Sequence, residues 1–107
     1  MPSDKEHLAR ALGMLAGDSE VTYRQMMGEY LLYVGGKLVG GVYDNRLLLK
    51  HTPTAERLLA ESESGVRLAV PYEGAKPMLD FSEAEAELVL RAAEAAVREL
   101  PAPKRKK

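Results

Sequence analysis

The chain has 107 residues, a length that fits one domain and excludes two. It contains no cysteine, which excludes a disulfide framework, a thiol nucleophile and a cysteine zinc site. The net charge of −1 argues against a globally basic nucleic-acid binder. No apolar run approaches the roughly 18–20 residues of a membrane span, and no signal peptide begins the chain. We therefore expect a cytoplasmic protein without a membrane segment.

The first predicted element is an amphipathic helix over residues 4–15. Ser3 followed by Glu6 is a capping-box pattern, in which the two side chains satisfy free amides at the start of a helix. Apolar side chains then recur with helical spacing at Leu8, Ala11, Leu12 and Leu15. Gly17 supplies the predicted stop.

A meander of three antiparallel strands is predicted next. The first strand begins at Val21 and is expected to run on to Val34, with Gly28 marking a bulge or bend. The other two strands cover residues 38–43 and 47–49. The dipeptides that separate the three strands tolerate the positive φ of tight hairpin turns, and they are Gly35-Gly36 and Asp44-Asn45.

Two features of this meander predict what packs against it. The run Tyr30–Val34 is apolar on both faces, which indicates a strand covered on both sides. We expect helices on one side and either the chain's own tail or a second copy of the protein on the other. Gly40 and Gly41 lie inside a strand, where glycine costs stability. The expected compensation is the close approach of a packed helix.

The second half of the chain is predicted to alternate again between helix and strand. Thr52 and Pro53 open a short helix. The remaining elements are a strand over 66–70, a loop over 71–77, a strand over 78–81 and a helix over 83–99. Ser82 with Glu85 is a second capping box at the start of that last helix.

The predicted order is therefore α-β3-α-β2-α, a two-layer α+β domain over residues 1–100 with helices on a largely antiparallel sheet. Residues 101–107 are predicted to be a disordered basic tail.

The sequence offers little that predicts catalysis. Gly36-Lys37 is followed by Leu38, so the phosphate-binding loop pattern is absent. His7 and His51 have no metal-ligand spacing with one another or with a neighbour, and no GxSxG nucleophile pattern occurs. We expect no enzyme, no cofactor and no metal site.

Two segments could bind a partner or ligand. The loop after the fourth predicted strand carries Tyr72, Glu73 and Lys76 between prolines, and loops held by a rigid sheet are where binding residues concentrate. The alternative is a plain connection with Tyr72 folded onto the core. The tail, with its cations Lys104, Arg105, Lys106 and Lys107, is either a solvated end or an arm that gives weak, salt-sensitive contact with phosphates.

Several short motifs carry a family resemblance. They are Arg24, Met26 and Gly28 ahead of Tyr30 and Tyr33, then Gly36-Lys37, then Asp44-Asn45-Arg46-Leu47, and finally Tyr72-Glu73-Gly74. With these motifs in this order, the chain resembles the N-terminal domain of the TfoX/Sxy family of bacterial competence regulators over residues 8 to about 100. The resemblance implies a fold similar to type III secretion chaperones, which often form homodimers, and a non-enzymatic role.

Two functional hypotheses follow. The first is a small regulatory protein that acts through protein–protein contacts as a homodimer, which predicts a contiguous apolar patch on a sheet face or edge. The second is a small-ligand or nucleic-acid binding module, which predicts that its site residues converge on one concave surface. Those residues would be Arg24, Arg46, Lys50, Tyr72, Glu73 and Lys76.

Overall fold

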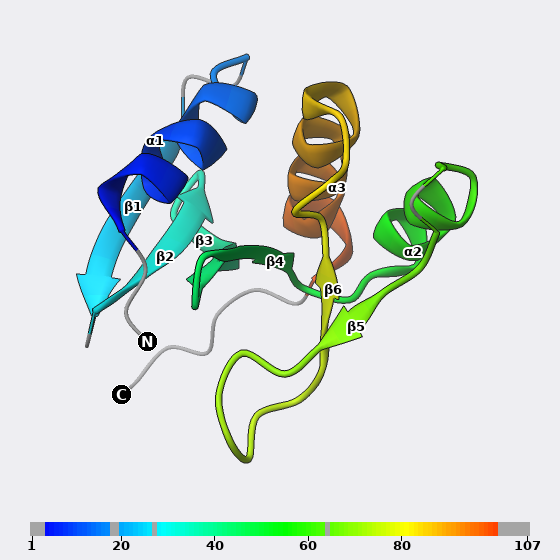
Figure 1. Cartoon of the computed structure of the whole chain (residues 1–107). Helices are drawn as coiled ribbons and strands as arrows, with labels where there is room; N and C mark the ends of the chain where they lie inside the picture. The colour runs from blue at the N-terminus through cyan, green and yellow to red at the C-terminus, as the bar shows by residue number, and fades with distance from the viewer. Residues whose placement is uncertain (1–3, 18–19, 27, 64, 101–107) are drawn as a thin grey trace, which may run out of the picture.

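The computed structural model describes residues 4–17, 20–26, 28–63 and 65–100, and Figure 1 shows them as helices on one antiparallel sheet. The helices are α1 (Lys5–Met14), α2 (Pro53–Ala60) and α3 (Ala86–Glu99). The strands are β1 (Val21–Met26), β2 (Glu29–Val34), β3 (Lys37–Tyr43), β4 (Arg46–Leu49), β5 (Leu68–Ala69) and β6 (Met78–Asp80). Their order in the sheet is β1-β2-β3-β4-β6-β5. The predicted α+β class with an antiparallel sheet is thus confirmed, while the predicted tail lies outside the described residues.

Four strands precede α2, where the sequence predicted three. β1 and β2 are antiparallel partners, with Met26 opposite Glu29, and Gly28 between them has φ of +83°. The prediction that one strand runs on through Gly28 with a bulge or bend was therefore wrong, because the chain reverses there. A glycine with positive φ serves a bulge and a hairpin equally well, so the residue type alone did not decide between them.

The two other predicted turns are confirmed. Gly35 and Gly36 have φ of +59° and +82°, and Asp44 and Asn45 have φ of +52° and +60°. Positive φ at both central residues is what a two-residue hairpin requires. The second turn is also held from outside, because the Asp44 amide donates to both carboxylate oxygens of Glu29 at 3.1 and 3.2 Å.

The helix starts agree with the sequence in one case of three. Thr52 caps α2 by accepting a hydrogen bond from the Ala55 amide at 3.1 Å, as predicted. At α1 the cap is Asp4, which accepts from the His7 amide at 3.0 Å, and Ser3 lies outside the described residues. The predicted capping box of Ser82 and Glu85 was wrong.

A tertiary contact replaces that second capping box. α3 begins only at Ala86, and its cap Glu85 makes no side-chain hydrogen bond to the helix. The Ser82 hydroxyl instead accepts from the Leu47 amide of β4 at 3.0 Å. The Ser82 side chain, which the local sequence pattern predicted to cap the helix, therefore bonds to the sheet instead.

The main core lies between the sheet and the helices. α1 and α3 cover one face of the sheet, and α2 packs against α3 (Figure 1). The largest fully buried side chains of this core are Leu15, Leu32, Val39, Val42, Leu49, Leu59, Leu79, Phe81 and Val89. Removing them from water supplies the main driving force for folding, at about 25 cal/mol per Å² of apolar surface.

The closest neighbours of Gly40 and Gly41 belong to the sheet and not to the expected helix, although α3 does pack against β3. A Cβ on Gly40 would lie 2.3 Å from the Leu48 carbonyl oxygen and 2.8 Å from the Leu49 side chain. A Cβ on Gly41 would lie 2.5 Å from the Tyr30 carbonyl oxygen and 2.8 Å from the Tyr43 ring. The two glycines instead make room for neighbouring strands and for side chains of the sheet itself.

Lys37, which follows the first glycine turn, holds the end of α3. Its Nζ donates to the carbonyl oxygens of Val97 at 2.7 Å and Leu100 at 2.9 Å. The last carbonyls of a helix lack partners within the helix, and a cation there also interacts favourably with the helix dipole. The lysine of the rejected phosphate-loop pattern thus has a structural role.

Candidate binding surfaces of the sheet

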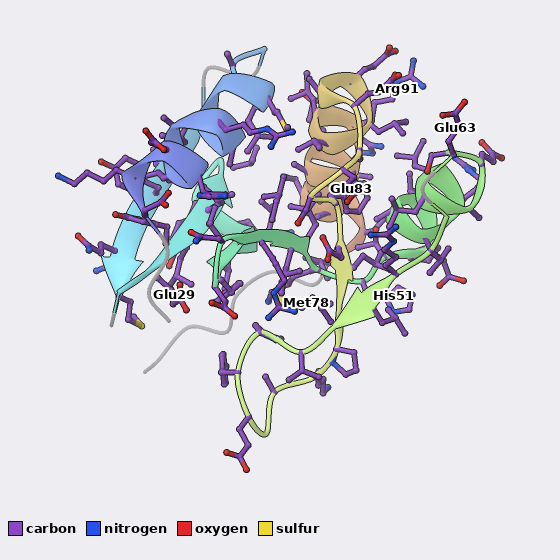
Figure 2. The ribbon with its side chains drawn as sticks, viewed as in Figure 1. Glu29, His51, Glu63, Met78, Glu83 and Arg91 are labelled. Atoms are coloured by element: carbon purple, nitrogen blue, oxygen red, sulfur yellow. The ribbon has the colours of Figure 1, made fainter. Side chains whose placement is uncertain are left out.

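The face of the sheet turned away from α1 and α3 carries a second, smaller apolar cluster. Tyr43, Leu48 and Met78 are buried there, with Leu31 and Ala69 packed against them. Figure 2 shows Met78 on the side of β4 that faces away from these two helices. Leu31 in this cluster and Leu32 in the main core explain why β2 is apolar on both faces, since successive side chains of a strand point to opposite sides.

A groove runs between this face and the loop over residues 71–77, which extends below the sheet in Figure 1. Its volume is about 530 Å³, and its lining includes Tyr43, Lys50, Tyr72, Lys76 and Met78. This volume is within the range of roughly 300–1,000 Å³ that is typical of small-molecule sites.

The structure brings together half of the predicted site residues. Lys50, Tyr72 and Lys76 line the groove, whereas Arg24 and Glu73 do not. Arg24 is on β1, opposite Leu31 of β2, and Glu73 is an exposed residue of the loop. The strand-end and loop residues therefore meet, but the six predicted residues do not form one concave surface.

Arg46 lies beside the groove without lining it. Its Nη2 atom is 3.5 Å from the Val70 carbonyl oxygen, just before the loop. Its Nε atom is buried and, among the described residues, has no hydrogen-bond partner. Arg46 therefore joins β4 to the start of the loop.

The groove is cationic and partly apolar. Within the described part of the chain it is lined by two lysines and by no carboxylate. Burial raises the pKa of the Tyr43 phenol to about 12, helped by the nearby Tyr72, Glu29 and Tyr33. Tyr43 therefore keeps its proton at neutral pH. An arrangement of phenols, lysines and apolar walls suits an anionic ligand with an apolar body.

Both histidines are paired with carboxylates at helix starts. His7 Nδ1 lies 2.6 Å from Asp4 Oδ1, and hydrogen bonds from His7 lower the pKa of Asp4. His51 Nε2 pairs with the Glu56 carboxylate. In the described residues there is no cluster of three potential metal ligands, and none of the helices is long and apolar enough to cross a membrane.

The edge of the sheet formed by β1 is a second candidate surface, which the sequence did not reveal because strand order cannot be read from periodicity. Thr22–Met26 are all exposed. The Glu20 carbonyl oxygen accepts from the Gly35 amide at 3.1 Å, so Glu20 faces β2. Because backbone groups alternate in an antiparallel ladder, those of Val21, Tyr23 and Gln25 point away from β2, to an edge with which no other described strand pairs.

Tyr23 is a large apolar side chain exposed at this edge, as is Met26 at the end of the strand. The Tyr23 side chain is 49% exposed, and its ring meets that of Tyr30 edge to face with centroids 6.1 Å apart. Beside it is a shallow hollow of about 490 Å³, whose lining includes Leu12, Ala16 and Val21. The hollow lies between α1 and β1, next to the free edge.

Comparison with known proteins places the chain in a family. Residues 13–100 match the TfoX N-terminal domain. The chain belongs to the TfoX N-terminal domain family. This is not a known family of enzymes. The chain is also 35% identical to an uncharacterised 12.7 kDa protein in the trpE 5′ region of Spirochaeta aurantia, in an alignment of 112 residues that covers 100% of this chain and 91% of that protein. No solved structure matches significantly.

Proposed function

We propose that this TfoX N-terminal domain is a non-enzymatic, cytoplasmic regulatory protein that acts through protein–protein contacts as a homodimer formed at the β1 edge. The observation that carries the proposal is the backbone of β1 at Val21, Tyr23 and Gln25, which no other strand of the described residues pairs with, beside exposed apolar side chains. Strands that pair with such an edge gain main-chain hydrogen bonds as well as apolar contacts.

The scarcity of protective features at β1 supports this use. Soluble proteins usually blunt a free strand edge with proline, charged side chains, a bulge or a very short strand. β1 has six residues, contains no proline or lysine, and has a regular register with β2. Its one charged residue is Arg24. An edge left this open is suited to pairing with another chain.

The test is the mass of the protein in solution, measured by light scattering over a series of concentrations. We expect the mass of a dimer for the native chain and of a monomer for Gln25→Pro. Proline at position 25 removes an amide that points to the free edge, so the β1–β2 ladder stays intact. The matched control is Leu68→Pro on the opposite edge, which should remain a dimer. A native chain that stays monomeric at high concentration would contradict the proposal.

A second candidate function is the binding of a small anion with an apolar body in the groove. It is favoured by the convergence of Lys50, Tyr72 and Lys76 in a lining with no carboxylate among the described residues. The test uses anilinonaphthalene sulfonate as the probe, with fluorescence as the readout. Saturable binding should be lost when Lys50 and Lys76 are both changed to Glu, and should persist in Lys5→Glu, which alters an exposed lysine on α1.

Nucleic-acid binding is the competing version of this second function. It would depend on Lys104, Arg105, Lys106 and Lys107, and its affinity would fall steeply with salt. Titration of a fluorescent oligonucleotide into the full chain and into a variant lacking residues 101–107 separates the two versions. Binding that disappears with these residues, while the sulfonate probe still binds, would assign the tail and the groove to different ligands.

A further inference from the structure

We infer that two copies of the chain pair β1 antiparallel to β1, with the two Tyr23 residues directly opposite each other on the two-fold axis. The two six-stranded sheets then become one continuous sheet. The inference rests on the proposed homodimer and specifies the register of its interface.

The alternation of backbone groups limits the registers that are available. In an antiparallel pair, hydrogen bonds form between residues whose backbone groups point toward each other. At the free edge of β1 these are Val21, Tyr23 and Gln25. A two-fold axis must therefore match outward residues with outward residues. Within β1 the axis can then pass through any residue, and an axis through Thr22, Tyr23 or Arg24 pairs at least two of the outward residues.

Counting the hydrogen bonds selects the register centred on Tyr23. In that register Val21 lies opposite the partner's Gln25, and Tyr23 lies opposite the partner's Tyr23. All three outward residues are paired, which gives about six main-chain hydrogen bonds. With the axis on Thr22, Gln25 lies opposite a position outside β1. With the axis on Arg24, Val21 lies opposite a position outside β1. Each of those registers gives about four such bonds within β1.

The side chains favour the same register. Centring on Arg24 would place this guanidinium opposite Arg24 of the partner subunit, and like charges directly opposite each other are destabilising. Centring on Tyr23 places Arg24 opposite the partner's Thr22. It also brings two half-exposed Tyr23 rings together, and aromatic cross-strand pairs are stabilising.

The hollow beside β1 could accommodate the two Tyr23 rings. A two-fold axis perpendicular to the sheet keeps the helices of both copies on the same face. Tyr23 lies on that face, next to Leu12 and Ala16. The partner's Tyr23 would therefore reach a hollow that is already lined by apolar side chains. A second copy is thus complementary to this edge both in its backbone and in its side chains.

The absence of cysteine makes a direct test of register simple. Single substitutions Thr22→Cys, Tyr23→Cys and Arg24→Cys are made in the full chain, oxidised under mild conditions and compared on non-reducing gels. Directly opposite residues have Cα atoms about 4.5–5.5 Å apart, within the range for a disulfide. Tyr23→Cys should form covalent dimer at least tenfold faster than the other two. Faster cross-linking of Thr22→Cys or Arg24→Cys would overturn the register.

A mixing experiment covers the case in which loss of the Tyr23 ring weakens the dimer. In the proposed register Thr22 lies opposite the partner's Arg24, so an equimolar mixture of Thr22→Cys and Arg24→Cys should give mainly the mixed disulfide. If the two variants cross-link no better together than apart, the register is wrong. Light scattering on the native chain distinguishes this failure from that of the proposed function, since a dimer would still be present.

Leu68→Cys serves as the control for the opposite edge. It should stay largely uncross-linked if the dimer forms at β1. Rapid cross-linking of Leu68→Cys in a chain that is dimeric by light scattering would move the interface to β5 and overturn the inference.

Discussion

The two edges of the sheet expose similar apolar side chains but differ in backbone. Tyr23 on β1 is 49% exposed and Leu68 on β5 is 57% exposed. β1 has six residues paired in register with β2, whereas β5 has two and is soon followed by Pro71. A short strand and a nearby proline are ways in which proteins protect an edge from pairing. Apolar exposure alone therefore does not distinguish the two edges, whereas the length and regular pairing of the edge strand do.

The strand next to each edge strand also differs in length. β1 is backed by the six residues of β2, and Tyr23 is opposite the fully buried Leu32. β5 is backed by the three residues of β6. A partner strand added to β1 would thus join a longer paired part of the sheet than one added to β5.

The largest expected effect comes from weakening the support of β1. Leu32→Ala should lower the free energy of unfolding by about 2–5 kcal/mol, because it leaves a cavity in a packed core. Leu68→Ala, at an exposed position, should change it by no more than about 0.5 kcal/mol. Urea denaturation at one fixed protein concentration measures both. Equal losses for the two variants would mean that the edges are supported alike.

The next effect is on assembly. Tyr23→Asp places two carboxylates opposite each other on the proposed two-fold axis, and such like-charge contacts cost several kcal/mol. We expect the dissociation constant of the dimer to rise roughly 100-fold, or about 2.7 kcal/mol. Leu68→Asp should leave it unchanged. Analytical ultracentrifugation measures both constants, and a similar rise in the two would remove the distinction between the edges.

A substitution on β3, which lies between the two edge strands, should lower the stability of the fold without affecting dimer formation. Lys37→Met removes both hydrogen bonds to the last carbonyls of α3, and bonds to a charged group contribute about 1.5–3 kcal/mol. We expect a loss near the lower end of that range, because Lys37 is only half-buried. Hydrogen exchange should accelerate in the last turn of α3. A change in the dissociation constant of the dimer would show that the contact of Lys37 with α3 also affects the β1 edge.

The smallest expected effect is a loss of stability at high pH only. It concerns Tyr43, on the face of the sheet turned away from α1 and α3. The pKa of Tyr43 is raised to about 12, mainly by burial, so the folded state favours the protonated phenol. Its contribution to stability is full below about pH 10 and is lost as the pH rises through 12. Ultraviolet titration should detect one tyrosine that ionises near pH 12 in the native chain and is absent in Tyr43→Phe. Titration of that tyrosine near pH 10 would contradict its burial.

The sequence predicted best where a few neighbouring residues decide the structure. The turns at Gly35-Gly36 and Asp44-Asn45 and the cap at Thr52 depend on local backbone conformation, and all three are confirmed. Ser82 and Gly28 were misassigned because each residue type serves two local structures. A distant partner, the Leu47 amide, decided the first case, and the pairing of β1 with β2 decided the second.

The candidate binding surfaces, too, were predicted from the sequence only in part. The sequence predicted Lys50, Tyr72 and Lys76 as candidate binding residues from their types and from the proline-flanked loop. Their place in one groove depends on the loop lying near β4. The sequence predicted an apolar patch on a sheet face or edge, but it did not predict that β1 is an edge strand. Composition and periodicity by themselves determined the α+β class, the turns and the apolar character of β2, because these follow from local conformational preferences. Only the tertiary structure decided which strand is left at the edge and which side chains meet across the sheet, because strand order is set by packing between residues far apart in the chain.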